Sequence, residues 1–118
     1  GIDRGGAATS TVFRFNKRTG TWHKASSLAI GRYGASATAI GKEILVCGGI
    51  SARGEETRTC EIFDGASWRM AREMNHARAF AGAVSVSGRA VIKGGQCGES
   101  NVYDTVEEYD LKKNTWKE

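Results

Sequence analysis

The side chains best suited to metal or thiol chemistry in this sequence are three cysteines and two histidines. They are Cys47, Cys60, Cys97, His23 and His76. No cysteines form a C-x-x-C pair, and the histidines do not show the ligand spacing of a zinc site. Copper centres need clustered histidine and tyrosine ligands, which the sequence does not bring near one another. We therefore expect no metal site and no cofactor.

The acidic and glycine-rich segments do not form a catalytic motif. Glu55-Glu56 and Glu107-Glu108 are adjacent pairs, and neighbouring residues of a strand point to opposite faces. Residues 94–100 (GGQCGES) contain glycines, but no helix follows them, as a phosphate-binding or dinucleotide-binding loop would require. We expect no catalytic residue, so the sequence predicts that this chain is not an enzyme.

The odd, sparse cysteine count does not indicate a disulfide framework. Reduced thiols in a cytosolic protein are therefore the expectation. One alternative stays open, because Cys47 and Cys60 would face each other across a hairpin centred near Arg53 and Gly54.

Composition and charge exclude several classes of protein. The chain has 118 residues, of which 25% are charged, with a formal net charge of +4 and a pI near 9.2. Lysine, arginine and acidic residues are interspersed, which indicates a mixed solvated surface and no nucleic-acid partner. No apolar run approaches the ~20 residues of a membrane span, and no secretory signal is visible. We expect a cytoplasmic protein, with association to the cytoskeleton as a further option.

The chain repeats itself with a period of 46 to 48 residues, the separations between its three tryptophans. Two glycine doublets, and two arginines that precede them by 16 residues, are each 46 apart. The markers are Trp22, Trp68 and Trp116; Gly48-Gly49 and Gly94-Gly95; and Arg32 and Arg78. Gly1 stands 21 residues before Trp22, as Gly95 does before Trp116. A fixed period of this length indicates a repeat architecture.

Each repeat is expected to contain short strands separated by turn signals. The expected strands cover residues 35–40, 43–47, 57–63, 67–71, 80–86, 89–93, 104–110 and 115–118. Four strands over ~40–50 residues are typical of a propeller blade. The predicted fold is all-β, a partial β-propeller of about two and a half blades built from four-stranded antiparallel sheets.

The predicted units are 1–31, the C-terminal half of a first blade, 32–77, the second blade, and 78–118, the third. Because propellers have ~4–8 blades, we expect the remaining blades to come from the same or other chains.

An apolar strand ending in a glycine doublet, followed by an aromatic residue, a Trp and an Arg that opens the next unit, resembles the kelch repeat. The resemblance covers essentially the whole chain. It implies architectural roles for Trp22, Trp68, Trp116, Gly48, Gly49, Gly94, Gly95, Arg32 and Arg78. The chain departs from the family where Gly31 and Ala77 replace a frequent proline. It also departs where Lys93 occupies the apolar position of Cys47.

Function is expected in the loops at one rim. These are residues 50–57 and 96–103, which follow the doublets, and residues 29–34 and 75–80, which join units. In the kelch proteins that this chain resembles, such loops recognise short segments of partner proteins. The predicted partner-binding residues are Tyr33, Arg53, Glu55, Phe80, Ser100, Asn101 and Tyr103. Exposed aromatic residues and arginine are typical interface anchors.

The resemblance leaves three function classes open. The first is the substrate-recognition part of a BTB-kelch adaptor for a cullin-RING ubiquitin ligase. The second is an actin-binding or cross-linking protein similar to scruin. The third is a kelch-fold enzyme such as a copper-radical oxidase, which the absence of a ligand cluster disfavours.

Overall fold

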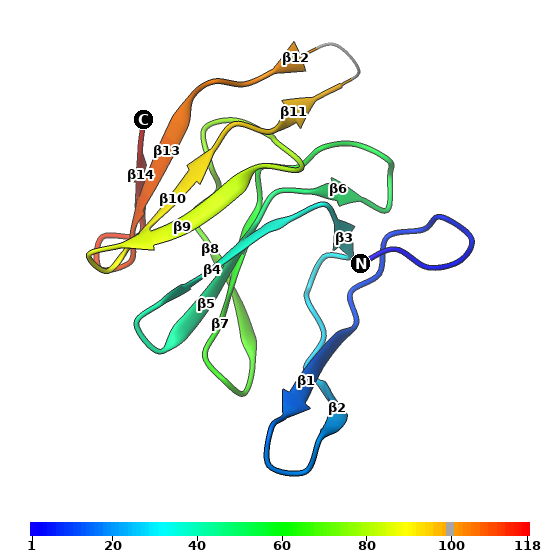
Figure 1. Cartoon of the computed structure of the whole chain (residues 1–118). Coiled ribbons are helices and arrows are strands. Elements are labelled where there is room, and N and C mark those ends of the chain that lie inside the picture. The colour runs from blue at the N-terminus through cyan, green and yellow to red at the C-terminus, as the bar shows by residue number, and fades with distance from the viewer. Residues whose placement is uncertain (99–100) are drawn as a thin grey trace.

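The computed structural model of the chain describes residues 1–98 and 101–118, and the elements within them are all strands (Figure 1). Ten strands form the main units: β1 (Val12–Asn16), β2 (Thr21–Ala25), β4 (Ser36–Ile40), β5 (Glu43–Cys47), β7 (Cys60–Phe63), β8 (Trp68–Ala71), β9 (Gly82–Val86), β10 (Arg89–Lys93), β13 (Val106–Asp110) and β14 (Thr115–Lys117). Four two-residue strands lie in the connections: β3 (Arg32–Tyr33), β6 (Ile50–Ser51), β11 (Gln96–Cys97) and β12 (Asn101–Val102). No helix in the described part of the chain could cross a bilayer.

Two complete sheets have the same antiparallel topology. The second unit has the strand order β4-β5-β7-β8, and the third has β9-β10-β13-β14. The hairpin β1–β2 stands beside the second sheet and corresponds to the two outer strands of a further unit. The innermost strands β4 and β9 contact each other and lie side by side in Figure 1. This arrangement is the predicted partial propeller of two and a half blades.

The core lies between the two complete sheets. Alternation along β5 buries Leu45 and Cys47, and β7 adds Cys60 and Ile62. Ala90, Ile92 and Tyr109 approach from the third unit, and Met74 from the connection. Fully burying a large apolar side chain contributes roughly 1.5–3 kcal/mol, so blade-to-blade packing is the main source of stability.

The expected strands lie close to the observed ones, with one instructive difference. Residues 57–63 were expected as one strand, but β7 begins only at Cys60. The preceding residues serve another purpose: the Thr57 backbone N–H donates to the Gly49 carbonyl at 2.9 Å, and the Thr59 carbonyl accepts from Arg32. Their hydrogen bonds fasten a loop to the sheet end and do not extend the ladder.

The glycine doublets place backbone where a side chain would not fit. Gly48 and Gly49 have φ values of 70° and 92°, in the left-handed region that favours glycine. A Cβ on Gly49 would lie 2.6 Å from the Tyr33 carbonyl oxygen, and one on Gly95 would lie 2.7 Å from that of Ala79. The doublets therefore bring the end of one strand against the start of its own repeat.

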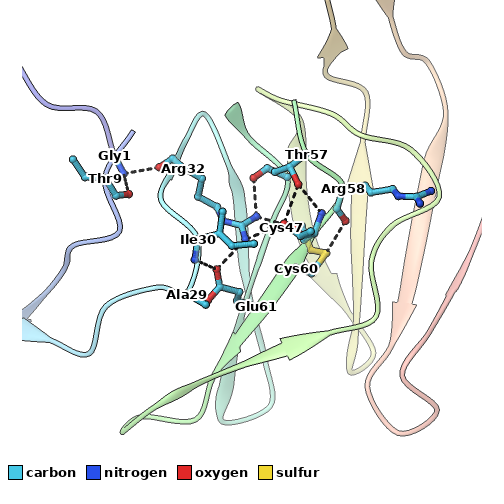
Figure 2. Close-up of polar contacts among 12 residues, drawn as sticks. Gly1, Thr9, Ala29, Ile30, Arg32, Cys47, Thr57, Arg58, Cys60 and Glu61 are labelled. Carbon is cyan, nitrogen blue, oxygen red and sulfur yellow. Dashed lines mark hydrogen bonds and ion pairs between the residues drawn. A yellow bond between two sulfur atoms is a disulfide. The ribbon is translucent and has the colours of Figure 1, made fainter. Parts of the chain in front are cut away.

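The expectation of three reduced thiols is wrong for two cysteines. Strand register places Cys47 directly opposite Cys60, with 4.2 Å between their Cα atoms. Such close approach is typical of a non-hydrogen-bonded antiparallel pair, at ~4.5 Å. The two sulfurs form a disulfide (Figure 2), whereas Cys97 is free and half-buried.

Lys93 is exposed, because the outer face of the third sheet carries no further blade in this structure.

Candidate functional site

The predicted functional loops gather at one end of the sheets (Figure 1). The short pairs β3–β6 and β11–β12 mark this end, and the tight turns β1–β2, β4–β5 and β9–β10 lie at the opposite end. We call residues 29–34, 50–57, 75–80, 96–98 and 101–103 the loop rim.

Arg32 anchors the rim of the second unit. Its Nη1 donates to the carbonyls of Gly48 and Thr59 at 2.9 and 2.8 Å. Its Nη2 donates to Thr59 Oγ1 at 3.2 Å and pairs with Glu61 Oε2 at 2.9 Å. The side chains of Arg32 and Glu61 are almost fully buried (Figure 2). A guanidinium presents more N–H donors than a lysine ammonium and holds them in a fixed planar fork, which suits it to this set of acceptors.

Glu61 extends this network into the neighbouring loop. Its two carboxylate oxygens accept the backbone N–H groups of Ala29 and Ile30 at 2.6 and 3.1 Å (Figure 2). The loop from the first unit is therefore held by a residue of the second. A buried carboxylate with these partners avoids the cost of an unpaired buried charge.

The third unit repeats the network atom for atom. Arg78 binds the carbonyls of Gly94 and Thr105 at 2.9 and 3.1 Å, and it pairs with Glu107 Oε2 at 2.8 Å. Glu107 in turn accepts from the backbone N–H groups of Asn75 and His76 at 2.6 and 3.3 Å. Each network fixes the loop that enters its unit.

Sequence reasoning missed Glu61 and Glu107. The interspersed charges of the sequence predict a mixed solvated surface, but the carboxylates of Glu61 and Glu107 are fully buried. The signal was present: each glutamate follows its arginine by 29 residues, and the two are 46 apart. Applying the repeat period to acidic residues as well as to arginine would have found them.

Phe80 and Tyr33 lie together at the junction of the two units. Phe80 is 58% exposed, has φ +57°, and occupies the repeat position held by Gly34 in the preceding unit. Its backbone N–H donates to the Gly34 carbonyl at 2.8 Å, and a Cβ on Gly34 would lie 2.7 Å from the Phe80 ring. Tyr33 adjoins Gly34 and is half-buried through its pairing with Ile50. A bulky residue in the left-handed region is strained and is often found at functional sites.

Arg53 and Glu55 lie on the exposed turn after β6 and line a hollow of about 480 Å³. The turn is closed by Ser51, whose backbone N–H donates to the Glu55 carbonyl at 2.9 Å. Ile30 and Gly31, from the loop that Glu61 holds, form the other wall. The hollow thus presents one positive and one negative side chain, Arg53 and Glu55, beside the loop that Glu61 holds in place.

Tyr103 lies against two residues of the loop that enters the third unit. The Arg78 guanidinium lies 4.8 Å from the centre of its ring, and the His76 ring centre is 5.5 Å away. Burial raises the pKa of the Tyr103 hydroxyl, and the neighbouring Cys97 thiol adds to the shift. Asn101 is exposed in β12, opposite Cys97. Ser100 lies outside the described residues.

The tryptophans connect units at the outer edge of the sheets. The Trp68 indole N–H donates to the Ser26 carbonyl at 2.8 Å, and that of Trp116 donates to the Arg72 carbonyl at 2.7 Å. Each acceptor belongs to the preceding unit. Trp22 packs on Phe15 but is 67% exposed.

Taken together, the described rim residues form three groups: Tyr33 with Phe80, Arg53 with Glu55, and Tyr103 with His76 and Arg78. Within the described ranges, no three His, Cys, Asp or Glu residues lie close enough to hold a metal ion. The exposed aromatic and charged groups are suited to binding a polypeptide segment.

Comparisons with known proteins identify relatives of this chain. The family model for the Kelch motif matches residues 31–75 and 77–118. An F-box/kelch-repeat protein of Arabidopsis thaliana is 30% identical over 86 residues, which cover 71% of this chain and 20% of that protein. The solved structure of YjhT matches with a TM-score of 0.70 at 14% identity, over 82% of this chain and 34% of that chain. The chain therefore spans only a minor part of either relative.

Proposed function

Because the chain belongs to the kelch-repeat family, we propose that it recognises a partner protein through the loop rim, as the substrate-recognition part of a BTB-kelch adaptor for a cullin-RING ubiquitin ligase. Kelch propellers are protein-interaction modules, and most members of the family are not enzymes. We propose that this chain likewise has no catalytic role.

The observation that carries this proposal is Phe80. The same repeat position holds glycine in the second unit, where the backbone also has a positive φ of 66°. Placing phenylalanine there costs conformational energy, about 1–2 kcal/mol for an L-residue in the left-handed region. The ring is nevertheless largely exposed on the rim. A partner that covers it would offset that cost by burying its apolar surface.

Affinity capture with the intact protein tests the adaptor proposal. The wild type is expected to recover a cullin scaffold together with a substrate protein. Phe80→Ala and Arg53→Ala are expected to lose the substrate while keeping the scaffold, because the rim is separate from a BTB contact. Lys113→Ala, an exposed change at the turn end, is the matched control. Repeated capture of neither protein by the wild type would end the proposal.

Actin binding is the alternative and is measured with the same protein. A filament-binding protein would co-sediment with actin, and changes on several units would each weaken that binding moderately. An actin pellet free of the protein, together with substrate capture sensitive to Phe80, favours peptide recognition.

We also propose a cytoplasmic location, where cysteine pairs are normally reduced. In that compartment the Cys47–Cys60 disulfide of this structure is expected to be reduced to two opposed thiols. Rapid alkylation in intact cells, followed by mass measurement of the unreduced protein, should then label both. A disulfide that survives in freshly quenched cells would contradict this location.

A further inference from the structure

Adjacent units meet at a groove between the outer hairpin of one unit and the outer turn of the next, and the structure contains this groove twice. The first lies between the β1–β2 hairpin and the β7–β8 turn, with a volume of about 670 Å³. The second lies between the β7–β8 hairpin and the β13–β14 turn, with a volume of about 230 Å³. The two equivalent grooves therefore differ in volume within one chain.

Side chains fill the second groove. Ile62, only 2% exposed, fills it from the hairpin, and Met70 lines it from the neighbouring strand. Tyr109, Leu111 and Asn114 enter from the opposite unit. Asn114 Oδ1 accepts from the Tyr109 hydroxyl and from the Arg72 backbone N–H, which closes the site with hydrogen bonds.

Different residues leave the first groove open. Arg14 precedes Phe15 as Ile62 precedes Phe63, and Lys24 follows Trp22 by two residues as Met70 follows Trp68. On the opposite wall the turn offers only small residues, Gly65 and Ala66. Two apolar side chains are thus replaced by two exposed cations at matching positions.

The first groove is positively charged without a compensating acid. Arg14, Lys17 and Lys24 line it with His23, and its described lining includes no carboxylate. None of the three cations forms an ion pair within residues 1–98 and 101–118. The nearby Asp64 uses Oδ1 to accept from the Ala66 and Ser67 backbone N–H groups of its own turn.

The charge belongs to a wider asymmetry of the sequence. Residues 4–42 contain seven basic residues and no aspartate or glutamate: Arg4, Arg14, Lys17, Arg18, Lys24, Arg32 and Lys42. Only Arg32 among them is buried and paired. A surface of one sign draws partners of the opposite sign.

Fixed contacts hold the two walls of the groove together. Ser26 Oγ donates to the Ala66 carbonyl at 2.6 Å, and the Trp68 indole donates to the Ser26 carbonyl at 2.8 Å. These bonds connect the hairpin side directly to the opposite turn. The groove is therefore formed before any partner arrives, which lowers the cost of binding.

We propose that this basic groove binds an acidic, Asp- and Glu-rich segment of a protein, as a second interaction surface at the end opposite the loop rim. A polypeptide fits better than a nucleic acid, because the two rings that line the groove are already packed. Phe15 lies 5.0 Å from Trp22 and Phe63 lies 4.9 Å from Trp68. Phe63 is half-buried in this contact, so the wall of the second unit offers little of the free ring face on which single-stranded nucleic acids stack.

The test transfers the residues of the closed groove to the open one. Binding of a fluorescent oligoglutamate peptide to the intact protein is measured by anisotropy, with oligoglutamine as the uncharged probe. Arg14→Ile with Lys24→Met is expected to weaken oligoglutamate binding about tenfold. The double variant removes two exposed ion pairs with the peptide, each contributing up to about 1 kcal/mol, and a tenfold change in affinity corresponds to ~1.4 kcal/mol. Lys112→Met with Lys113→Met removes the same charge at a different turn and should change affinity less than about twofold.

Further measurements keep the proposal falsifiable. Thermal unfolding checks that the double variant folds, and Lys17→Glu in the exposed turn gives an independent reduction if it does not. Phe80→Ala should leave oligoglutamate binding unchanged, which separates this groove from the proposed rim function. Equal weakening by the Lys112/Lys113 control would show a general charge effect and overturn the proposal. Tighter binding of oligouridylate than of oligoglutamate would overturn it in favour of nucleic acid.

Discussion

Arg32 and Arg78 show how a repeat places charge inside a protein without leaving it unpaired. Each guanidinium meets two carbonyls, a threonine hydroxyl and a glutamate, and each glutamate closes the loop of the preceding unit. Because the pairs are buried, the cost of removing both charges from water offsets much of their Coulomb attraction. Their main effect is therefore to hold the loops in one position. They fix the backbone from which the exposed rim residues project.

Glu107→Ala is expected to destabilise the protein strongly, by roughly 3–5 kcal/mol, because Arg78 would remain buried without its partner. Glu108→Ala, on the neighbouring position of β13, removes only an exposed contact with Arg89 and should cost less than about 1 kcal/mol. Urea unfolding of the two variants measures the difference. Similar losses for both would mean that the buried pair does not anchor the loop.

Phe80→Asn separates strain from recognition. Asparagine tolerates the left-handed region better than phenylalanine, so the free energy of unfolding should stay within about 1 kcal/mol of the wild type or rise. Affinity for the rim partner should fall by about tenfold or more, since exposed aromatic anchors often contribute 2 kcal/mol or more. A variant that loses several kcal/mol of stability would show that Phe80 is chiefly structural.

At the scale of elements, the sheet of the second unit is tied together by an ion pair that spans its strands as well as through its core. Glu43 on β5 accepts two hydrogen bonds from Arg69 on β8, at 2.6 and 3.2 Å, across the intervening strand. The same β8 supplies Trp68, which binds the preceding unit. The outermost strand is thus held from both sides of its own sheet.

The Arg69 hydrogen bond lowers the pKa of Glu43 below its ordinary value of 4.5. The ion pair therefore stabilises the fold fully above pH 4.5, and its contribution is lost as pH falls through the lowered pKa. NMR titration of the Glu43 carboxyl should show the depressed midpoint, and Arg69→Met should move it back up. An unchanged midpoint in the variant would assign the shift to another group.

At the scale of the whole molecule, two sheet faces lack the neighbour that the fold requires. Val84 and Val86 are exposed on the third unit, and Phe13, Phe15 and Trp22 are exposed on the first. At both internal unit boundaries of the described chain, the equivalent Trp is half-buried and its indole donates to a carbonyl of the preceding unit. Because a propeller closes with ~4–8 blades, we expect further blades to cover both faces, and the unit boundaries after residues 31 and 77 stay predictions.

Trp22 tests this expectation in the intact protein. If a preceding blade is present, Trp22→Phe and Trp68→Phe should each cost about 1–2 kcal/mol, because both lose an indole hydrogen bond and packed surface. Iodide quenching of Trp22 fluorescence, in a variant where the other tryptophans are phenylalanine, reports its exposure directly. Full accessibility would mean that no blade covers this face.

The sequence alone determined the repeat and most of its strands. The features that indicated them are local or periodic: glycines that must adopt positive φ, an apolar run such as residues 43–47, and tryptophans at a fixed period. They constrain each unit in the same way wherever it lies. That is why β5 and β10 begin and end where the pattern predicted.

Only the tertiary structure decided what depends on register and on the neighbouring unit. The sequence left open whether Cys47 bonds to Cys60 across their hairpin, and the register of β5 and β7 decided that they do. The repeat spacing contains Glu61, but its burial depends on the loop from the preceding unit that closes over it. The open basic groove likewise exists because the cationic residues of the β1–β2 hairpin line a gap whose other side is a turn of small residues. Each of these outcomes is set by which side chains stand opposite one another across a gap, and the order of residues along one chain segment does not contain that information.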